Sequence, residues 1–209
     1  MTPVAAVVAV EGLPGAGKTT CARLVSAQLG WPEVLEQYTD HPFLGTVYRE
    51  PVRHNLLVEM QFLLLHFAQY RELSTGGSVI ADFAPAKDLV FADLVLSGDD
   101  ATLFRRLYDH FYEGMPGPAL TVFIDTPPDE CLHRVRARGR EFERNMQIEW
   151  LEELRTAYLQ RFEVLGSHVR RIEAPADATA PEVAARIVNH IGDDLLAHHT
   201  PSAGDGTTC

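Results

Sequence analysis

The chain has 209 residues, of which 18 are Lys or Arg and 29 are Asp or Glu, so its formal net charge is −11. This acidity argues against binding to nucleic acids or to anionic membranes, and no apolar run approaches the ~20 residues of a membrane span. The 3 cysteines have no metal-ligand spacing and the N-terminus has no signal-peptide pattern, so we expect a cytoplasmic protein.

Short apolar runs alternate with longer helical patterns, which predicts one α/β domain over residues 1–198 with five parallel strands flanked by helices. The strands are expected to be buried on both faces and to lie at Val4–Val10, Glu33–Leu35, Ser78–Phe83, Ala119–Asp125 and His168–Glu173. The helices are expected at Lys18–Leu29, Arg53–Leu73, Lys87–Leu96, Asp100–Phe111, Pro128–Arg138, Ile148–Leu165 and Pro181–His198. Residues 199–209 are expected to form a disordered tail.

A phosphate-binding loop follows the first predicted strand. The segment GLPGAGKT, from Gly12 to Thr19, fits G-x-x-x-x-G-K-[ST] between a strand and a helix. Glycines let successive backbone N–H groups point at phosphate oxygens, while Lys18 adds positive charge and the Thr19 hydroxyl can bind Mg²⁺. The sequence therefore predicts a nucleoside triphosphate site formed by Gly12, Gly15, Ala16, Gly17, Lys18, Thr19 and Thr20.

Arginines are concentrated in one later segment, at Arg134, Arg136, Arg138, Arg140 and Arg144. Helical spacing would place Arg134 and Arg138 on one face and Arg136 and Arg140 on another. Planar guanidinium groups suit the oxygens of a phosphoryl group, so the segment indicates an arginine-rich lid. The alternative is a solvated basic helix paired with Glu141, Glu143 and Glu149.

Together with the phosphate loop, several further motifs resemble those of the deoxynucleoside kinase family. They are Glu36, His41-Pro42-Phe43-Leu44, Tyr48, Pro51, Ala81-Asp82-Phe83, Leu89-Val90-Phe91-Ala92, and Cys131-Leu132-His133-Arg134 followed by Arg138-Gly139-Arg140. The resemblance covers about residues 4–175 and implies a P-loop kinase fold. It also implies transfer of the ATP γ-phosphate, with Mg²⁺, to the 5′-hydroxyl of a deoxyribonucleoside in nucleotide salvage. Family members are commonly dimers, and Leu56–Leu65 and Leu89–Leu96 are apolar enough to form an interface, or else core.

The resemblance assigns roles to individual residues of this chain. Glu36 would accept the proton of the 5′-hydroxyl, and Asp82 would hold Mg²⁺. The transferring phosphoryl group would be clamped by Arg134, Arg138 and Arg140. For Glu36 the alternative is an exposed surface glutamate, and for Asp82 a helix N-cap.

Further roles implied by the resemblance concern the sugar and the adenine of ATP. Tyr48 and Glu143 would bind the sugar 3′-hydroxyl, although Tyr48 could instead be a packing residue. The loop Ala174–Asp177, with Asp177 at its end, would border the adenine of ATP.

One departure from the family pattern follows the third strand. Many members carry an arginine directly after the strand-three acid, where this chain has Phe83. Lys87 lies four positions further on, and a branch of bacterial relatives shares this Asp-Phe…Lys form. We hypothesise that Lys87 supplies the missing catalytic charge, the alternative being a surface lysine on a helix.

A second departure concerns the residue that reads the base. Counted from Pro51, Glu59 occupies the spacing at which many family members place a base-reading glutamine, whereas Gln61 would need two inserted residues. A carboxylate only accepts hydrogen bonds and would pair with the N1 and N2 donors of guanine, which favours deoxyguanosine first and deoxyadenosine second. The alternative is that Glu59 faces solvent and Gln61 reads the base. His66 shares the helix face of Glu59 and is either a further ligand or a core histidine.

Two other functions remain open from the sequence. A nucleoside monophosphate kinase, such as a thymidylate kinase, would need an extra arginine near the third strand, where Phe83 stands. A P-loop module that binds nucleotides without catalysis would need switch loops instead of an arginine lid.

Overall fold

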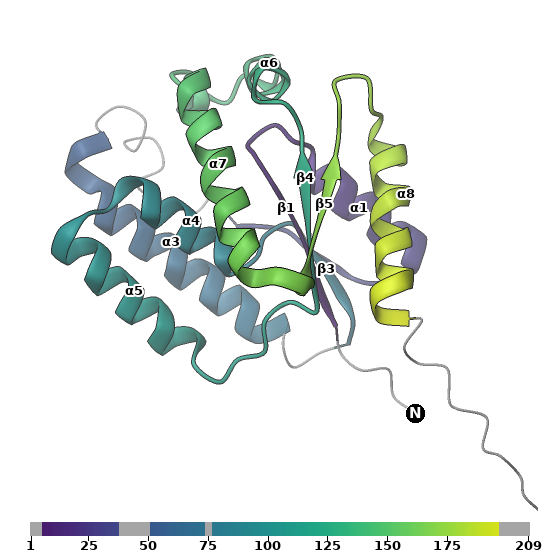
Figure 1. Ribbon diagram of the computed structural model, residues 1–209, viewed down its shortest axis with the longest axis horizontal. Helices are drawn as coiled ribbons and strands as arrows, with labels where there is room; N and C mark the ends of the chain where they lie inside the picture. The colour runs from purple at the N-terminus through teal and green to yellow at the C-terminus, as the bar shows by residue number, and fades with distance from the viewer. Residues whose placement is uncertain (1–5, 38–50, 74–76, 197–209) are drawn as a thin grey trace, which may run out of the picture.

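The computed structural model describes residues 6–37, 51–73 and 77–196, with backbone alone for 51–55 and 196. Within these residues one sheet of parallel strands has the order β2-β3-β1-β4-β5 (Figure 1), which confirms the predicted fold class. The strands are β1 (Val7–Gly12), β2 (Glu33–Val34), β3 (Val79–Ala81), β4 (Leu120–Asp125) and β5 (Val169–Glu173).

The central strands of the sheet are buried and the edge strands are not. Every residue of β1, β3 and β4 is buried, as predicted for parallel strands covered on both faces. The same expectation is wrong for β2 and β5, in which Ile172 is the only fully buried residue. Within the described sheet these two strands form the edges, so each has a neighbouring strand on one side only.

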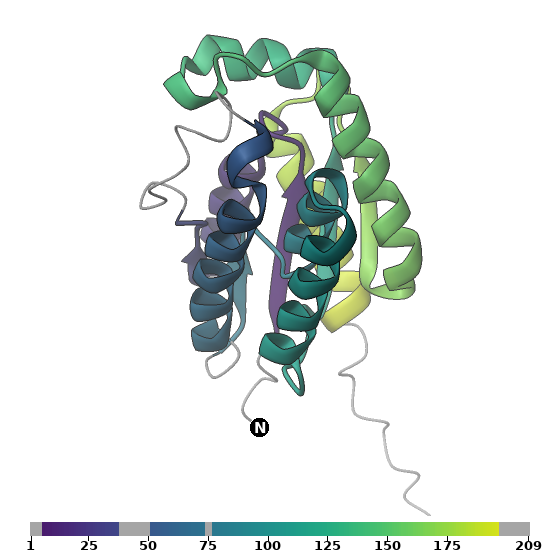
Figure 2. The same cartoon turned by 90° about the vertical axis from the view of Figure 1, so that its left-hand side faces the viewer.

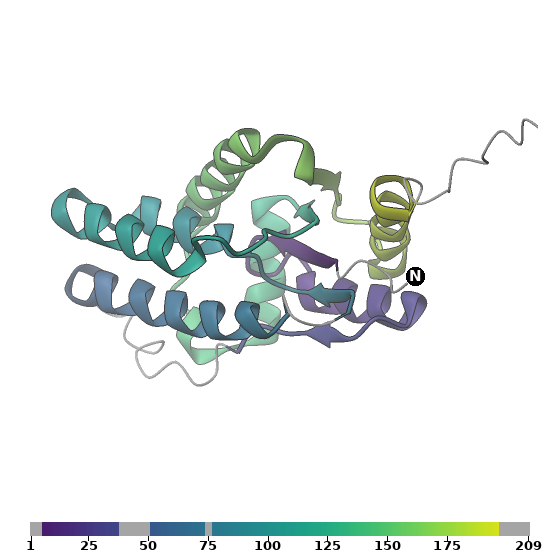
Figure 3. The same cartoon turned by 90° about the horizontal axis from the view of Figure 1, so that it is seen from below.

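Helices cover both faces of the sheet. On one face lie α1 (Lys18–Leu29) and α8 (Ala180–Ile191), and on the other lie α3 (Pro51–Leu73), α4 (Ala86–Val95), α5 (Gly98–Tyr112) and α7 (Ile148–Leu165) (Figures 1, 2 and 3). The remaining helix, α6 (Pro128–Arg138), lies across the carboxyl ends of the strands, at the top of Figure 1. None of the described helices is long and apolar enough to cross a membrane.

The ends of several helices differ from the predicted bounds for local reasons. Helix α8 starts with a capping box between Thr179 and Glu182, but it ends at Ile191 and not at His198. A π-helical turn, η3 (Gly192–Leu196), follows because Gly192 weakens continuation of the α-helix. The predicted tail at 199–209 lies outside the described residues.

The end of α6 decides how the arginine segment is arranged. Gly139 adopts a left-handed conformation with φ 70° and caps the helix after Arg138. Arg140 therefore lies beyond the helix, before a short 3₁₀ turn, η1 (Glu141–Glu143). The expectation that Arg136 and Arg140 share a helical face is wrong.

Apolar packing holds the phosphate loop from both ends. Val8 and Val10 of β1 and Cys21 and Val25 of α1 belong to one buried cluster. Burying each aliphatic side chain of this size stabilises the fold by about 1.5–3 kcal/mol. The loop between β1 and α1 is therefore anchored on two rigid elements.

Candidate active site

A cavity of about 690 Å³ lies at the carboxyl end of the sheet, between the phosphate loop, α3, α4, α6 and η1. Open α/β sheets bind their ligands at this edge. The charged and hydroxyl side chains of its lining are Lys18, Thr19, Thr20, Glu36, Glu59, His66, Asp82, Lys87, Asp88, Arg134, Arg138, Arg140 and Glu143. The structure thus brings most of the predicted site residues together.

The phosphate loop has the conformation that its glycines predict. Gly15 and Gly17 have φ values of 86° and 95°, and the N–H of Ala16 donates to the carbonyl of Leu13 at 3.0 Å. The Lys18 amine reaches back over the loop and donates to the Gly12 carbonyl at 2.9 Å. Burial, and then the charge of Lys87, lowers the pKa of Lys18. The loop therefore presents a lysine among backbone groups, ready to meet an anion.

Gly15 is the loop position at which a side chain is least tolerable. A Cβ added there would lie 2.4 Å from the backbone oxygen of Cys131 in α6, at a φ that L-residues rarely adopt. We expect Gly15→Ala to lower the free energy of unfolding by about 2–4 kcal/mol and to weaken ATP binding. Gly30→Ala is the control, because its φ is also positive at +69° but nothing lies within 4 Å of the added Cβ. Equal midpoints of urea unfolding for the two variants would contradict the prediction.

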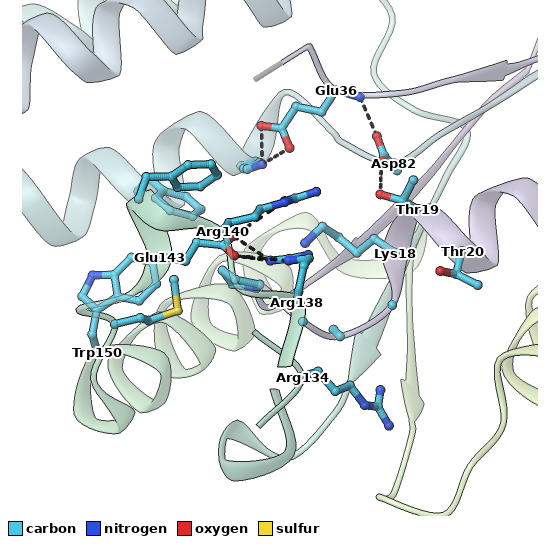
Figure 4. Close-up of a pocket in the computed structure, with 18 of the residues that line it drawn as sticks. Lys18, Thr19, Thr20, Glu36, Asp82, Arg134, Arg138, Arg140, Glu143 and Trp150 are labelled. Atoms are coloured by element: carbon cyan, nitrogen blue, oxygen red, sulfur yellow. Dashed lines mark hydrogen bonds and ion pairs between the residues drawn. The ribbon is translucent and has the colours of Figure 1, made fainter. Parts of the chain in front are cut away.

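Asp82 connects the start of α1 with the segment after β2. The Thr19 hydroxyl donates to Asp82 Oδ2 at 2.5 Å, and the backbone N–H of Glu36 donates to Asp82 Oδ1 at 2.7 Å (Figure 4). Mg²⁺ prefers such hard oxygen ligands, uses few of them from the protein and keeps several waters. The described residues hold no cluster of three or more His, Cys, Asp or Glu that would form an all-protein metal cage. The donor set of Thr19 and Asp82 fits Mg²⁺.

Glu36 and Lys87 form a buried ion pair in the cavity. The Lys87 ammonium lies 2.6 Å from each oxygen of Glu36, and the two side chains are only 12% and 13% exposed. The alternatives of a surface glutamate and a surface lysine are therefore wrong. Burial alone would raise the pKa of Glu36, but the Lys87 charge and the hydrogen bond from His66 outweigh it and hold that pKa well below its usual range. Glu36 is thus ionised at neutral pH.

His66 bridges two carboxylates from different elements. Its Nε2 lies 3.1 Å from Glu36 Oε1, and its Nδ1 lies 2.5 Å from Asp88 Oδ1. The ring of Phe83 stacks on the imidazole with a centroid distance of 5.1 Å. Burial opposes protonation, but the carboxylates of Asp88 and Glu36 prevail and raise the pKa of His66 to about 10. His66 is therefore a charged bridge and not a neutral core histidine.

Two buried acids of this region were not singled out from the sequence. Asp88 is 2% exposed and binds His66, and Glu11 is 0% exposed and accepts hydrogen bonds from the Ala84 N–H and the Tyr158 hydroxyl. Burial raises the pKa of Glu11. Asp88 directly follows Lys87 and Glu11 directly precedes Gly12, and both of these neighbours were predicted site residues. This adjacency was the signal in the sequence that could have indicated the two acids.

Glu59 and Gln61, the two candidates for the residue that reads the base, differ in their position relative to the cavity. Glu59 lines the cavity and is 6% exposed, whereas Gln61 is half-buried and does not line it. The alternative in which Glu59 faces solvent is therefore wrong. Burial, followed by the charge of Asp88, raises the pKa of Glu59 to about 8 against the opposing effects of His66 and Lys87.

The lid arginines are held by acids of their own segment. Arg138 donates two hydrogen bonds through Nη2 to the oxygens of Glu143, at 2.6 and 2.7 Å, and Arg140 lies 3.7 Å from the same carboxylate. Arg134 donates through Nε to Glu130 at 2.7 Å. In Figure 4, Arg138 and Arg140 lie near Lys18, while Arg134 points away from it.

The other predicted contacts are placed less directly. Arg136 and Arg144 are exposed and do not line the cavity. Asp177 is also exposed and outside the lining, although Ala174 of the same loop and Ala178, which directly follows the loop, belong to the lining. Tyr48 lies outside the described residues, as does the motif at 41–44.

An apolar wall completes the cavity and was not predicted as part of the site. It is formed by Phe62, Phe91, Phe142, Met146 and Trp150. In a sequence, apolar side chains at helical spacing predict residues of the hydrophobic core. Only the position of α3, α4 and α7 around the cavity shows that these side chains line it. The rings of Phe91 and Trp150 lie 5.9 Å apart. A flat, apolar ligand group has room beside the polar cluster.

Several known nucleoside kinases have sequences similar to that of this chain. The chain is 32% identical over 156 residues to deoxyguanosine kinase from Bacillus subtilis, which covers 72% of this chain and 75% of the relative. Deoxyadenosine kinase from Dictyostelium discoideum is 26% identical over 96% of this chain and 86% of its own. Thymidylate kinase from Xanthomonas campestris is 28% identical over 96% and 91%.

The fold agrees with a solved structure at low sequence identity. Deoxyadenosine kinase from M. mycoides, solved with the products dCMP and a flexible dCDP, superposes with a TM-score of 0.79 at 17% identity over 90% of this chain and 99% of that chain. Residues 8–196 match the sequence profile of the deoxynucleoside kinase family. The chain therefore belongs to the deoxynucleoside kinase family and is a phosphotransferase that uses a nucleotide as its phosphate donor.

Proposed function

We propose that this protein transfers the γ-phosphoryl group of ATP to the 5′-hydroxyl of a purine deoxyribonucleoside, as a step of nucleotide salvage. The observation that carries the proposal is the contact of the Glu36 carboxyl group with the Lys87 ammonium at 2.6 Å. Glu36 lies in the cavity that Lys18 also lines (Figure 4). A carboxylate in that place can accept the proton of an acceptor hydroxyl, while the phosphate loop holds the donor.

The donor side of the site is formed by the phosphate loop. Backbone N–H groups of the loop and the Lys18 amine would bind the β- and γ-phosphates. Thr19 and Asp82 would hold Mg²⁺, which when bound neutralises charge on the phosphate oxygens. Asp82 also holds the backbone of Glu36, so the same carboxylate links the donor side to the acceptor side.

On the acceptor side, Glu36 orients the 5′-hydroxyl and takes its proton late in the transfer. A loose transition state asks little basicity of this group, so a carboxylate with a low pKa is sufficient. Lys87 keeps Glu36 ionised and holds it in place, and in this way it would supply the positive charge of the arginine that many family members carry. His66 fixes the same carboxylate from α3.

The lid supplies positive charge to the phosphoryl group in the transition state of the transfer. Arg138 and Arg140 would bind its equatorial oxygens, with Glu143 orienting Arg138 through three hydrogen bonds. Because Arg134 points away from Lys18, we assign it to the donor nucleotide and not to the transferring group. Glu143, with Tyr48, remains the proposed contact of the sugar 3′-hydroxyl.

The base is proposed to be a purine, deoxyguanosine first and deoxyadenosine second. Glu59 lies in the cavity beside the apolar wall, where a base would meet both. The similar proteins from Bacillus subtilis and Dictyostelium discoideum, which are named for deoxyguanosine and deoxyadenosine, support this choice.

A panel of acceptors tests the proposal. We expect Mg²⁺-dependent ADP release with deoxyguanosine and deoxyadenosine, and about 10²-fold lower kcat/KM with thymidine. Each deoxynucleoside monophosphate forms the control arm. Thymidylate kinase activity is the second candidate because of the similarity over 96% of the chain. It is disfavoured because Phe83 is buried where an acceptor phosphate would need a cation. ADP release with thymidylate alone, or with no acceptor, would contradict the proposal.

We also propose that the protein is a homodimer. Leu57 and Leu64 lie seven residues apart on α3 and are 54% and 50% exposed. Leu89–Leu96, by contrast, places Val90 and Ala92 in the core. Sedimentation velocity of the intact protein measures the oligomeric state, and a monomeric boundary at micromolar concentration would remove this proposal.

A further inference from the structure

Glu59 is a buried acid that lines the cavity, and no described residue pairs with its carboxyl group. It lies on α3, is 6% exposed and lines the cavity beside Val58 and Phe62. Among the described residues, no hydrogen bond or ion pair is formed by its carboxyl group. Ionising a carboxyl group in such a place costs free energy, because the charge is removed from water without a compensating partner.

Among the described residues, the two cations that act on Glu59 are His66 and Lys87, and both are already bound to other acids. On α3, both ring nitrogens of His66 are used, by Asp88 and by Glu36. On α4, the Lys87 ammonium holds both oxygens of Glu36. A third described charged neighbour, Asp88, is an acid that repels a second negative charge. Burial and Asp88 together raise the pKa of Glu59 to about 8, despite His66 and Lys87.

We propose that Glu59 meets the base as a neutral carboxylic acid, and that its proton decides whether adenine is accepted. The inference rests on the proposed function, because it assumes that a deoxynucleoside occupies the cavity. From the residue type alone, Glu59 was expected to be an ionised carboxylate that only accepts hydrogen bonds. In its neutral form the side chain also donates one.

The two protonation states present different hydrogen-bonding groups. A neutral carboxyl offers one O–H donor and one C=O acceptor, whereas a carboxylate offers acceptors only. Adenine presents N1 as an acceptor beside the N6 amino donor, so it needs the neutral form. Guanine presents O6 and N1–H to the neutral form, or N1–H and the N2 amino group to the carboxylate. Deoxyguanosine is therefore accepted in both states and deoxyadenosine in one.

This difference predicts a pH-dependent ratio of kcat/KM for the two nucleosides. Between about pH 6.5 and about pH 8.5, a group with a pKa of about 8 loses about three quarters of its proton occupancy. We expect the deoxyadenosine-to-deoxyguanosine ratio to fall about fourfold over that range. His66, with a pKa of about 10, keeps its charge throughout, and any titration that affects both nucleosides equally cancels in the ratio.

Glu59→Gln is the decisive variant. A glutamine side chain offers one kind of donor and one kind of acceptor at every pH. The variant should therefore phosphorylate deoxyadenosine, and its deoxyadenosine-to-deoxyguanosine ratio of kcat/KM should not change with pH. Glu163→Gln, an exposed acid on α7, is the matched control and should keep the wild-type dependence. A pH-independent ratio in the wild type, or the same fall in Glu59→Gln, would overturn the inference. Failure to phosphorylate any deoxynucleoside would instead overturn the proposed function.

Binding measured without turnover gives a second readout. At about pH 8.5, deoxyadenosine should bind with uptake of about 0.8 proton per site, because the ionised fraction of Glu59 must be protonated first. Calorimetry in two buffers of different ionisation enthalpy measures this uptake. Glu59→Gln should show none, and equal uptake by the two proteins would contradict the assignment of the proton to Glu59.

Discussion

Replacing Glu36 with glutamine is expected to lower kcat by about 10³-fold while leaving the KM for ATP nearly unchanged. The amide has the same shape but cannot take the proton of the 5′-hydroxyl, and it removes the anion that Lys87 and His66 both bind. The donor nucleotide is held by the phosphate loop, which Glu36 does not form. Steady-state kinetics at saturating deoxynucleoside, in which the release of ADP is monitored, measures the effect.

The control for this variant lies in the same short segment. Glu33→Gln removes an exposed carboxylate whose partner is Arg23 at 3.5 Å, and it should retain wild-type turnover. Thermal unfolding of both variants separates lost catalysis from lost folding. If folded Glu36→Gln keeps kcat within about threefold of the wild type, Glu36 is not the base.

Replacing Lys87 with alanine should reduce kcat/KM for the deoxynucleoside by about 10²-fold and destabilise the fold by about 3 kcal/mol. The variant leaves Glu36 buried, with His66 as the described side chain that still contacts its carboxylate. Since burial raises the pKa of Glu36 and the Lys87 charge opposes that rise, the pKa should move up in the variant. Activity should then fall as the pH drops through the new pKa, because the base must be ionised, whereas the wild type keeps Glu36 ionised.

Lys87→Arg is the matched control, because it keeps the positive charge beside Glu36. It should restore most of the turnover and remove the loss of activity on the acid side of the pH profile. A pH profile of Lys87→Ala parallel to that of the wild type would show that the lysine acts on stability alone. Unchanged turnover in Lys87→Ala would remove the proposed catalytic role altogether.

The sequence by itself determined the features that lie in contiguous segments. The phosphate loop is one such feature, since its glycines, Lys18 and Thr19 act through local backbone geometry between one strand and one helix. The strand-helix alternation likewise predicted the parallel sheet, because buried strands and amphipathic helices each have their own periodicity. The position of Asp82 after β3 placed it at the ligand-binding edge without knowledge of any partner.

The tertiary structure alone decided which distant charges meet. Glu36 lies in the segment after β2, His66 on α3 and Asp88 on α4, and no spacing along the chain indicates that one imidazole binds both acids. It also decided that Glu59 and not Gln61 lines the cavity, because a two-residue step on a helix turns a side chain away. The physical reason is burial. Whether an acid is ionised depends on which cations the fold leaves within reach of it, and that is a property of three-dimensional packing.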